Sequence, residues 1–494
     1  MTVTSTTGDD GRPWTLHPDR ALPAEPGVRA VARTILSATA PLPIVSMHGH
    51  VDAEMLAADA PFTDPAHLLV TPDHYLVRML VSQATAPGAV RDAGVRSVAD
   101  LGVGPDGETD PRTIWRRFCA GWSSLRGTPT RFWLEHVLAE VFEAPVAPSS
   151  ETADALFDHI ADRLAQPQYR PRALFDRFNI EVLATTDAAV SSLAAHARLA
   201  ADGWGRRVIP TFRPDALLEP ARDDWRGLLD ELSAVSGIDA HDYDGYLEAL
   251  RQRRRAFVRA GARASDHGHL SPDTTPLPAA EARRVFDVAR AGEATPAASA
   301  AFTAHMLFQM AEMASEDGLV MQLHPGVVRD HDRGIAARHG HDIGYDVPVA
   351  TEFTRSLRPV LEAFGHHPDF RMIVFTVDET VYSRELAPLA GVYPALRLGA
   401  PWWFLDTPDA IRRFREATTD TAGLRNTSGF VDDTRAFCSI PARHDLSRRA
   451  DAGFLARLVA EHRLDLDEAL DAAVDLAYRI PQDSYARPTA AVMA

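Results

Sequence analysis

Eight short runs of apolar and β-branched residues recur along the chain, and each predicts a buried strand. They are Ile44–Met47, Ile180–Thr185, Val208–Phe212, Ala262–Ser265, Leu319–Leu323, Met372–Val377, Ala395–Leu398 and Gly429–Val431. From the second run onward, helical or loop-rich stretches separate them, and Ser191–Ala201 and Thr407–Thr418 are examples with helical periodicity. Strands that alternate with helices indicate a parallel sheet, and eight such units predict an α/β fold, a closed (β/α)8 barrel of the TIM type.

One gap between the predicted strands is too long for a single crossover. Residues 51–179 separate the first two runs and contain aromatic residues at helical spacing. We therefore predict a mostly helical insertion at about residues 52–178 that covers the mouth of the barrel. The single barrel domain is expected to span residues 28–485, between a flexible tail at 1–27 and a second tail at 486–494.

The composition narrows the class of protein. The 494 residues carry a formal net charge of −17, which argues against nucleic acid or an anionic membrane as a partner. Only two cysteines occur, Cys119 and Cys438, so a disulfide framework and a cysteine zinc cluster are excluded. The chain starts without a signal-peptide pattern, and we expect a cytoplasmic protein.

Ionisable and aromatic side chains follow nearly every predicted strand. The first run ends at His48 and His50, which point to the same side of an extended chain, and neutral imidazole is the commonest protein ligand of divalent metals. The later runs are followed by Asp187, Arg213, Asp215, Asp266, His267, His269, His324, Arg329, Asp378, Trp402, Trp403, Asp433 and Arg435. Active sites of (β/α)8 barrels lie at the carboxyl ends of the strands, so the pattern favours a metal site there.

Each of these residues also has a simpler interpretation. An aspartate after a strand is usually a helix N-cap, and Trp402 is compatible with the core. His267 and His269 are compatible with a surface loop, which we favour for His269. The basic run from Arg251 to Arg255 is expected to form a solvated helix face.

Taken together, motifs from about residue 40 to about residue 480 resemble the uronate isomerases, also called glucuronate isomerases, of the amidohydrolase superfamily. The matching segments are His48-Gly49-His50, Asp73-His74-Tyr75 with Arg78, Thr185–Asp187, Phe212–Asp215, Ser265–His267, Gln322–Arg329, Gly399–Phe404, Asp433–Phe437 and Arg443–Asp445. The chain departs from the family's pattern at 377–381 and 330–333, near the expected substrate pocket. The resemblance therefore implies the reaction class and leaves the sugar preference open.

The implied reaction is the aldose–ketose isomerisation of a hexuronate. D-glucuronate would give D-fructuronate, or D-galacturonate would give D-tagaturonate, by proton transfer through an enediolate. A small-molecule hexuronate is thus the expected partner, and the resemblance also implies a homo-oligomer.

The resemblance also implies roles for individual residues. His48, His50 and Asp433 are the expected ligands of one divalent metal; zinc suits this set, and manganese or iron(II) also fits. Asp433, Arg435 and Tyr75 are the expected catalytic residues, with Tyr75 transferring a proton and Arg435 stabilising the oxyanion. We expect a nearby arginine to favour the ionised form of Tyr75. The expected substrate-binding residues are Arg213, Asp266, His324, Arg329, Trp402 and His74, and a metal-ligand role for His324 is an alternative.

Two other functions fit parts of the pattern. A metal-dependent hydrolase of the same superfamily, acting on a sugar-acid lactone, amide or ester, would use the same barrel and His-x-His motif. Such a hydrolase has no need for several pocket arginines or for the Asp73-His74-Tyr75 motif. A non-catalytic binding protein has no need for a complete set of metal ligands and oxyanion-stabilising groups.

Overall fold

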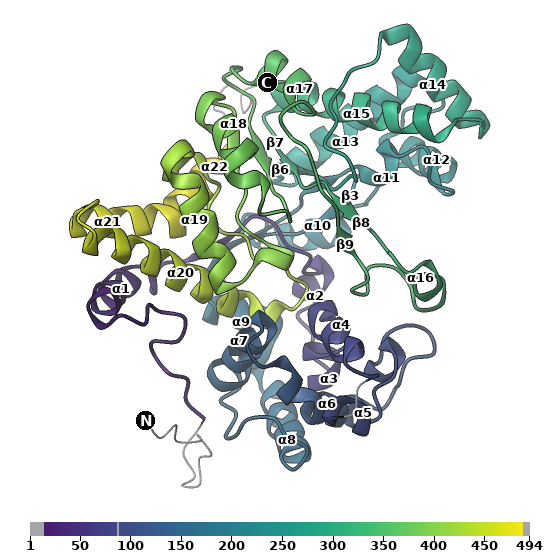
Figure 1. The fold of residues 1–494 in the computed structure, drawn as a ribbon. Coiled ribbons are helices and arrows are strands. Elements are labelled where there is room, and N and C mark those ends of the chain that lie inside the picture. The colour runs from purple at the N-terminus through teal and green to yellow at the C-terminus, as the bar shows by residue number, and fades with distance from the viewer. Residues whose placement is uncertain (1–13, 86–87, 488–494) are drawn as a thin grey trace.

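The computed structural model describes residues 14–85 and 88–487 as an α/β fold with parallel strands at its centre (Figure 1). The strands are β1 (Ile44–Ser46), β2 (Ile180–Ala184), β3 (Asp187–Ala188), β4 (Val208–Ile209), β5 (Phe212–Arg213), β6 (Ala264–His267), β7 (Val320–Leu323), β8 (Val327–Val328), β9 (Val347–Pro348), β10 (Met372–Val374) and β11 (Leu396–Leu398). The strands β8 and β9 form a separate antiparallel pair. Residues 1–13 and 488–494 of the expected tails lie outside the described residues. Residues 14–27 are described, and there Arg20 pairs with Asp445 at 3.0 Å.

The parallel strands form two hydrogen-bonded groups, in the orders β1-β2-β4 and β3-β5-β6-β7-β10-β11. The strand β3 continues the path of β2, and β5 continues that of β4 beyond Pro210, which has no N–H to donate to a ladder. Backbone hydrogen bonds span both steps, from Thr185 N to Ile209 O at 2.9 Å and from Asp187 N to Thr211 O at 3.0 Å. These hydrogen bonds therefore join the two groups of strands into one series of adjacent, parallel chain segments.

The predicted eighth strand, Gly429–Val431, is wrong. The backbone there makes only a single β-bridge, between Thr427 and Leu398. Gly429 has a φ of 77°, outside the extended region, and a Cβ at this position would lie 2.2 Å from Cγ of Pro481. Glycine is needed at this turn, and the turn ends the ladder.

Residues 427–434 nevertheless lie between β11 and β1. Ser428 N donates to Leu398 O at 2.8 Å, and His50 N donates to Thr434 O at 3.0 Å. The chain path after β11 thus reaches the carboxyl end of β1, where the two histidines of the first motif lie.

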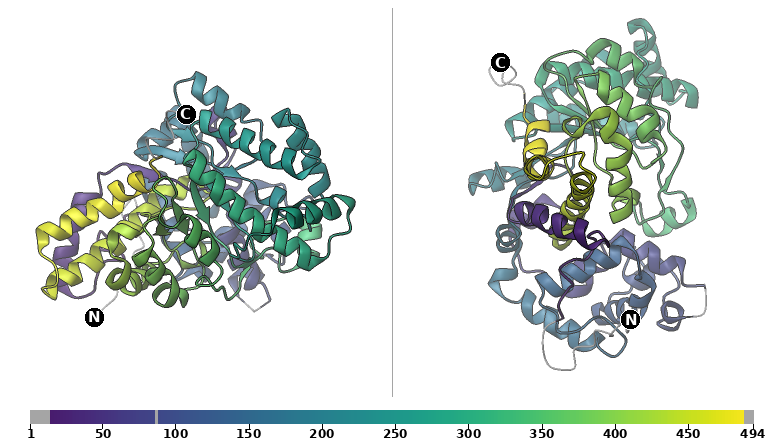
Figure 2. Two further views of the ribbon diagram at one scale, coloured as in Figure 1. Left: turned by 90° about the horizontal axis from the view of Figure 1, so that it is seen from above. Right: turned by 60° about the vertical axis from the view of Figure 1, so that its left-hand side comes forward.

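The segment between β1 and β2 is helical. Its elements are α2 (Ala53–Ala58), α3 (Pro65–Leu69), α4 (His74–Ser82), α5 (Ala89–Asp92), η1 (Val98–Leu101), α6 (Pro111–Gly121), η2 (Trp122–Leu125), α7 (Pro129–His136), η3 (Val137–Val141), α8 (Ala153–Leu164), η4 (Pro167–Tyr169) and α9 (Pro171–Arg177). They pack around buried Trp115, Phe118 and Leu138 in a core that also takes in Phe437 and Ile440. Figure 2 shows this segment in purple and blue beside the rest of the molecule.

The remaining helices lie around the strands. They are α1 (Pro26–Thr39), α10 (Ala194–Ala201), α11 (Asp215–Leu218), α12 (Trp225–Ser236), α13 (Tyr243–Arg259), α14 (Ala279–Ala291), α15 (Pro296–Asp317), α16 (Arg333–His339), α17 (Arg358–Phe364), η5 (Tyr382–Leu386), α18 (Ala387–Val392), η6 (Trp403–Leu405), α19 (Pro408–Ala422), η7 (Leu424–Asn426), η8 (Phe437–Ser439), α20 (Ile440–Ala460), α21 (Leu466–Val474), η9 (Asp475–Arg479) and α22 (Ile480–Ser484). Among the helices of the described ranges, none is long and apolar enough to cross a membrane.

Two arginines of the predicted solvated face are buried, so that prediction is wrong for them. Arg253 Nε donates to Ala189 O at 2.9 Å, and Arg254 Nε lies 2.6 Å from a carboxylate oxygen of Asp317. The guanidinium of Arg254 also lies over the ring of Phe212, 5.5 Å from its centroid. A run of like charges on a helix therefore does not all face water, since arginine can be buried when its donors are paired.

The strands enclose a core of small and branched side chains. Val45, Val182, Ile209, Val320 and Ile373 belong to it, and all are buried. The aromatic residues Tyr75, Trp133 and Trp402 belong to the same cluster. The apolar core thus continues up to the strand ends where the polar residues begin.

Candidate metal centre and cavity

Two histidines after β1 and one aspartate from the 427–434 segment converge. His48 Nε2 lies 3.3 Å from Asp433 Oδ1, and His50 Nε2 lies 3.1 Å from the same oxygen. Gly49, between the histidines, lies beside Asp432, and a Cβ there would be in ordinary contact with its Oδ1 at 3.4 Å. Asp433 has a φ of 41°, a sparsely populated backbone conformation of the kind that clusters at functional sites.

These three groups have the donor set of a divalent-metal site. His48 Nε2 and Asp433 Oδ1 are buried and have no hydrogen-bond partner within the described residues, while Gln322 Oε1 holds Nδ1 of His48 at 2.7 Å. Support of the second ring nitrogen is typical of a histidine ligand. Burial alone would raise the pKa of Asp433. Contacts with His48 and His50 outweigh burial and hold this pKa well below its usual value. The carboxylate is therefore ionised, as a metal ligand must be.

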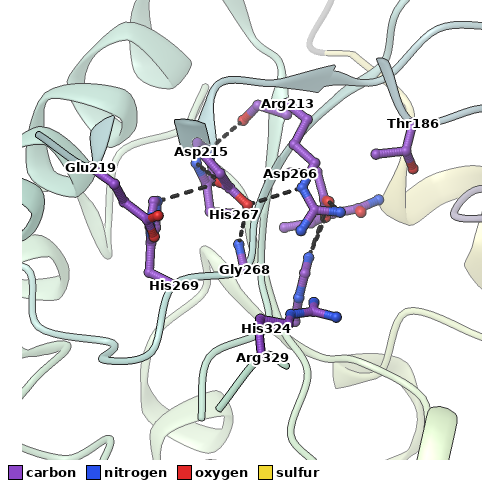
Figure 3. A network of polar contacts seen from close by, with 12 residues as sticks. Thr186, Arg213, Asp215, Glu219, Asp266, His267, Gly268, His269, His324 and Arg329 are labelled. Atoms are coloured by element: carbon purple, nitrogen blue, oxygen red, sulfur yellow. Dashed lines mark hydrogen bonds and ion pairs between the residues drawn. The ribbon is translucent and has the colours of Figure 1, made fainter. Parts of the chain in front are cut away.

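A second group containing His48 lies deeper, at the ends of β6 and β7. Asp266 Oδ1 lies 3.4 Å from His48 Nδ1, and His324 Nε2 lies 3.0 Å from Asp266. Arg213 Nη1 approaches Asp266 at 3.5 Å, and Figure 3 shows Arg213 and His324 around this carboxylate. A Cβ on Gly268 would lie 2.5 Å from Cε1 of His324, so glycine is required here. His48, Asp266 and His324 are themselves arranged closely enough to hold a metal ion, which keeps the alternative role of His324 open.

Aromatic side chains form the wall beside the histidines. Trp402 meets His48 and His324 edge-on, with ring centroids 5.0 and 4.8 Å apart. Its indole Nε1 is buried without a hydrogen-bond partner among the described residues. His74 also lines the cavity, and burial followed by the charge of Arg435 lowers its pKa to about 3. His74 is therefore neutral.

Tyr75 lies in the packed layer next to this wall. Its ring stacks on His74 with centroids 4.5 Å apart, and the guanidinium of Arg443 lies 5.1 Å from its centroid. Burial, and next the charge of Asp433, raise the pKa of Tyr75 well above its usual value. Arg443 does lower the pKa, in the direction expected of a nearby arginine, but burial outweighs it and the phenol is not ionised. Tyr75 is a neutral phenol.

Two of the three arginines expected to meet the substrate, Arg435 and Arg329, are paired with aspartates of the segment after β8. Arg435 donates to the backbone carbonyl of Asp342 at 3.1 Å and also pairs with its carboxylate. Arg329 Nη1 lies 2.8 Å from Asp346 Oδ2, and its guanidinium lies 4.7 Å from the ring centroid of Trp403. A substrate anion that binds either arginine therefore competes with a carboxylate of the protein.

The charged and aromatic groups described above, except those buried behind the wall, line one cavity of about 450 Å³. The cavity is lined by His50, His74, Arg213, Arg222, His324, Arg329, Asp330, His341, Asp342, Asp346, Trp402, Trp403, Asp433 and Arg435. The structure thus brings the sequence-predicted residues together around one space. His48, Tyr75 and Asp266 lie immediately behind its wall.

Several residues of the site were not assigned a role from the sequence. Gln322 binds His48 and also donates to Met47 O at 3.2 Å. The feature of the sequence that could have indicated its role is a polar side chain within an otherwise apolar strand. Asp342 and Asp346 lie in an irregular segment and reach the cavity only through the hairpin of β8 and β9. No periodicity or spacing in the sequence places them there.

The chain matches known proteins over almost its whole length. The family model for glucuronate isomerase matches residues 29–485. A uronate isomerase from Xanthomonas campestris pv. campestris (strain B100) is 50% identical over 477 residues, which cover 96% of this chain and 99% of that protein. The crystal structure of glucuronate isomerase from Caulobacter crescentus aligns with a TM-score of 0.92 at 47% identity, covering 97% of this chain and 99% of that one. A uronate isomerase structure from Thermotoga maritima aligns with a TM-score of 0.87 at 25% identity, over 96% of this chain and 100% of that one.

Proposed function

Since the chain belongs to the glucuronate isomerase family and isomerises hexuronates, we propose that the reaction takes place in the cavity beside His50, Asp433 and Arg435. One observation carries this assignment: two histidines and an ionised aspartate converge at the wall of a cavity that arginines also line. The strand succession is proposed to close through residues 427–434 into a (β/α)8 barrel, as a single domain of residues 28–485 with a helical insertion at about 52–178. The cavity would then lie at the carboxyl ends of its strands.

We assign His48, His50 and Asp433 as the ligands of one divalent metal. Zinc is proposed because two imidazoles and one carboxylate are a common zinc donor set that leaves a position open; manganese or iron(II) would accept the same ligands. Such an ion would supply Lewis acidity toward a substrate oxygen or anchor that oxygen. The pKa of His48 is raised to about 9, because Asp266 and Asp433 outweigh the effect of burial, so metal binding at neutral pH releases a proton.

Proton transfer is assigned to Asp433 and Tyr75. The Asp433 carboxylate takes the proton from C2 of the open-chain aldose, while the Tyr75 hydroxyl gives its proton to the carbonyl oxygen on C1. The resulting enediol then loses its O2 proton to the Tyr75 oxygen, and Asp433 returns its proton to C1. Both residues end as they began, and the product is the ketouronate. The ionised carboxyl and the neutral phenol are the protonation states that this sequence of steps requires.

The remaining cavity residues are assigned to charge stabilisation and substrate binding. Arg435 stabilises negative charge that develops on the substrate oxygens. Arg213 and Arg329 suit the substrate carboxylate, because guanidinium matches a carboxylate in bidentate geometry. His324, Trp402 and His74 complete the binding surface for the sugar hydroxyls and carbon chain. Asp266, expected from the sequence to bind substrate, is fully buried behind the cavity wall and holds His324 at 3.0 Å instead.

The assignment is tested by an isomerase assay on metal-analysed protein in heavy water, with D-glucuronate and D-galacturonate offered separately and products followed by NMR. We expect ketouronate with deuterium at C1. His48→Asn and Asp433→Asn should each lower turnover at least about tenfold, while Asp420→Asn on an exposed helix face should not. Full turnover in Asp433→Asn would remove this aspartate from the mechanism.

A further inference from the structure

A third group of metal-type ligands lies on the other side of β6. It consists of His267, the last residue of β6, His269 two residues later, and Asp215, the first residue of α11. His267 and His269 are 0% and 2% exposed, so the expectation that His269 lies in a surface loop is wrong. Successive side chains of a strand point to opposite faces. His267 therefore faces away from Asp266 and from the reaction cavity, and Figure 3 shows the two groups side by side.

Three polar atoms of this group face one another without a bonding partner. Asp215 Oδ1 lies 3.4 Å from Nε2 of His269 and 3.9 Å from Nδ1 of His267. All three atoms are buried, and none makes a hydrogen bond within the described part of the chain. Leaving buried polar atoms unpaired destabilises a folded protein. Three such atoms around one point have the arrangement of ligands around a cation.

The opposite atom of each group is held in place. His267 Nε2 lies 3.1 Å from Ser265 Oγ, and His269 Nδ1 lies 2.7 Å from Glu219 Oε1. Asp215 Oδ2 accepts hydrogen bonds from Gly268 N and from Arg213 Nε, both at 2.9 Å. Outer partners that fix the ring nitrogens and the carboxylate in this way are the usual surroundings of metal ligands.

A protonated histidine explains the group less well. His269 between Asp215 and Glu219 would be a suitable cation, and its pKa is raised because these carboxylates outweigh burial. However, its contact with Asp215 lacks hydrogen-bond geometry. A proton on His269 would also leave Nδ1 of His267 unpaired, and burial lowers the pKa of His267 to about 3. A single cation at the centre satisfies all three atoms.

We propose that Asp215, His267 and His269 bind a second divalent transition-metal cation, of the zinc class. Two histidines and one carboxylate are a suitable donor set, and a fourth position is open to water. Asp215, Glu219 and Gly268 also line a cavity of about 310 Å³, which shares Arg213, Arg222 and Arg329 with the lining of the reaction cavity.

The cation would position a substrate-binding arginine. Arg213 donates to Asp215 and lies 3.5 Å from Asp266 at the reaction cavity. An ion that fixes the Asp215 carboxylate therefore also fixes the guanidinium. This consequence for activity rests on the proposed function, whereas binding of the ion does not.

The test is the number of Co²⁺ and Zn²⁺ ions that the purified full-length protein binds, measured by elemental analysis and by cobalt d–d absorption during titration. We expect about two equivalents in the wild type and about one in both His48→Asn and His269→Gln. The matched control is His305→Gln, a buried histidine away from both groups, which should keep two. The cobalt spectrum of His269→Gln, which keeps the site of His48, His50 and Asp433, should differ from that of His48→Asn, which keeps the site of Asp215, His267 and His269.

A second variant protects the test against misfolding of His269→Gln. Glu219→Gln leaves all three ligands in place and should weaken the second equivalent about 10–100-fold. Two equivalents retained in His269→Gln, or a single equivalent in the wild type that His269→Gln leaves unchanged, would overturn the proposal. Protein that binds two ions but lacks isomerase activity would contradict the proposed function and leave the second site standing.

Discussion

At the scale of single residues, the charge of the cavity is balanced before any substrate arrives. Arg435 and Arg329 are paired with Asp342 and Asp346. A substrate carboxylate that binds either arginine would therefore replace a carboxylate of the protein. The side chain of Arg435 is about one-third exposed, and a partly exposed ion pair contributes only about 0–1 kcal/mol to stability.

Replacing this arginine should separate catalysis from folding. Arg435→Met is expected to lower kcat at least about tenfold, and a hundredfold loss would correspond to about 2.7 kcal/mol of transition-state stabilisation. The melting temperature should change little, because the lost pair is partly exposed. Steady-state kinetics and thermal unfolding measure the two effects, with Arg425→Met, which removes the pair between an exposed arginine and the buried Asp475, as the control. Near-normal kcat would exclude Arg435 from the chemistry.

At the scale of elements, α4 positions Tyr75 through the residue that begins the helix. The carboxylate of Asp73 accepts hydrogen bonds from the backbone N–H groups of Tyr75 at 3.0 Å and Leu76 at 3.1 Å. Such a cap stabilises a helix by about 0.5–2 kcal/mol. Here the first residues of the helix, His74 and Tyr75, also belong to the proposed site, so the cap would connect helix formation to catalysis.

Removal of the cap should therefore lower both stability and turnover. Asp73→Ala is expected to cost about 0.5–2 kcal/mol of unfolding free energy and to reduce kcat, whereas Asp73→Asn should restore both because asparagine also caps. Asp110→Ala removes the corresponding cap of α6, where Asp110 accepts from Arg112 N and Thr113 N. This control should lose stability and keep kcat. Equal kcat in Asp73→Ala and wild type would show that the cap does not position Tyr75.

Elements with a continuous apolar run were predictable from the sequence, and elements decided by tertiary contacts were not. The run that ends at Ser265 is a strand, β6. The run at Gly429 is not a strand, because a glycine packed against Pro481 turns the chain. The cavity residues predicted from the sequence follow strand ends, where the two-residue alternation of a strand fixes the direction in which each side chain points. Asp342 follows an irregular segment, and burial of His269 depends on Glu219, 50 residues away; neither is visible in local pattern.

At the scale of the whole molecule, helices that lie apart in the sequence are joined by buried polar contacts. His305 in α15 is one such contact. Its Nδ1 accepts from Leu277 N at 3.1 Å, and its Nε2 lies 2.5 Å from the hydroxyl of Tyr243 in α13. Burial lowers the pKa of His305 to about 4, and a proton on Nδ1 would break the bond from Leu277.

This histidine should make the free energy of unfolding depend on pH. Its folded pKa lies below the unfolded value of about 6.5, so its contribution is present above pH 6.5 and is lost as pH falls toward 4, by up to about 1.4 kcal/mol per pH unit. Denaturant unfolding of wild type and His305→Gln between pH 4 and 8 should show a steeper loss of stability on acidification in the wild type, while the slope from His74 and His267 is common to both proteins. Partly exposed His241, whose pKa Asp239 and Asp230 raise, should give a difference of opposite sign in His241→Gln. Parallel pH profiles for wild type and His305→Gln would contradict the assignment.

The hydrogen bond between His48 and Gln322 joins residues 274 positions apart. During synthesis at about 5–20 residues per second, roughly 15–55 s separate the appearance of these two side chains. The segment that carries Asp433 leaves the ribosome later still. A nascent chain therefore displays the two histidines that follow β1 long before their partners exist, and the proposed metal site of His48, His50 and Asp433 can assemble only after nearly the whole chain has been made.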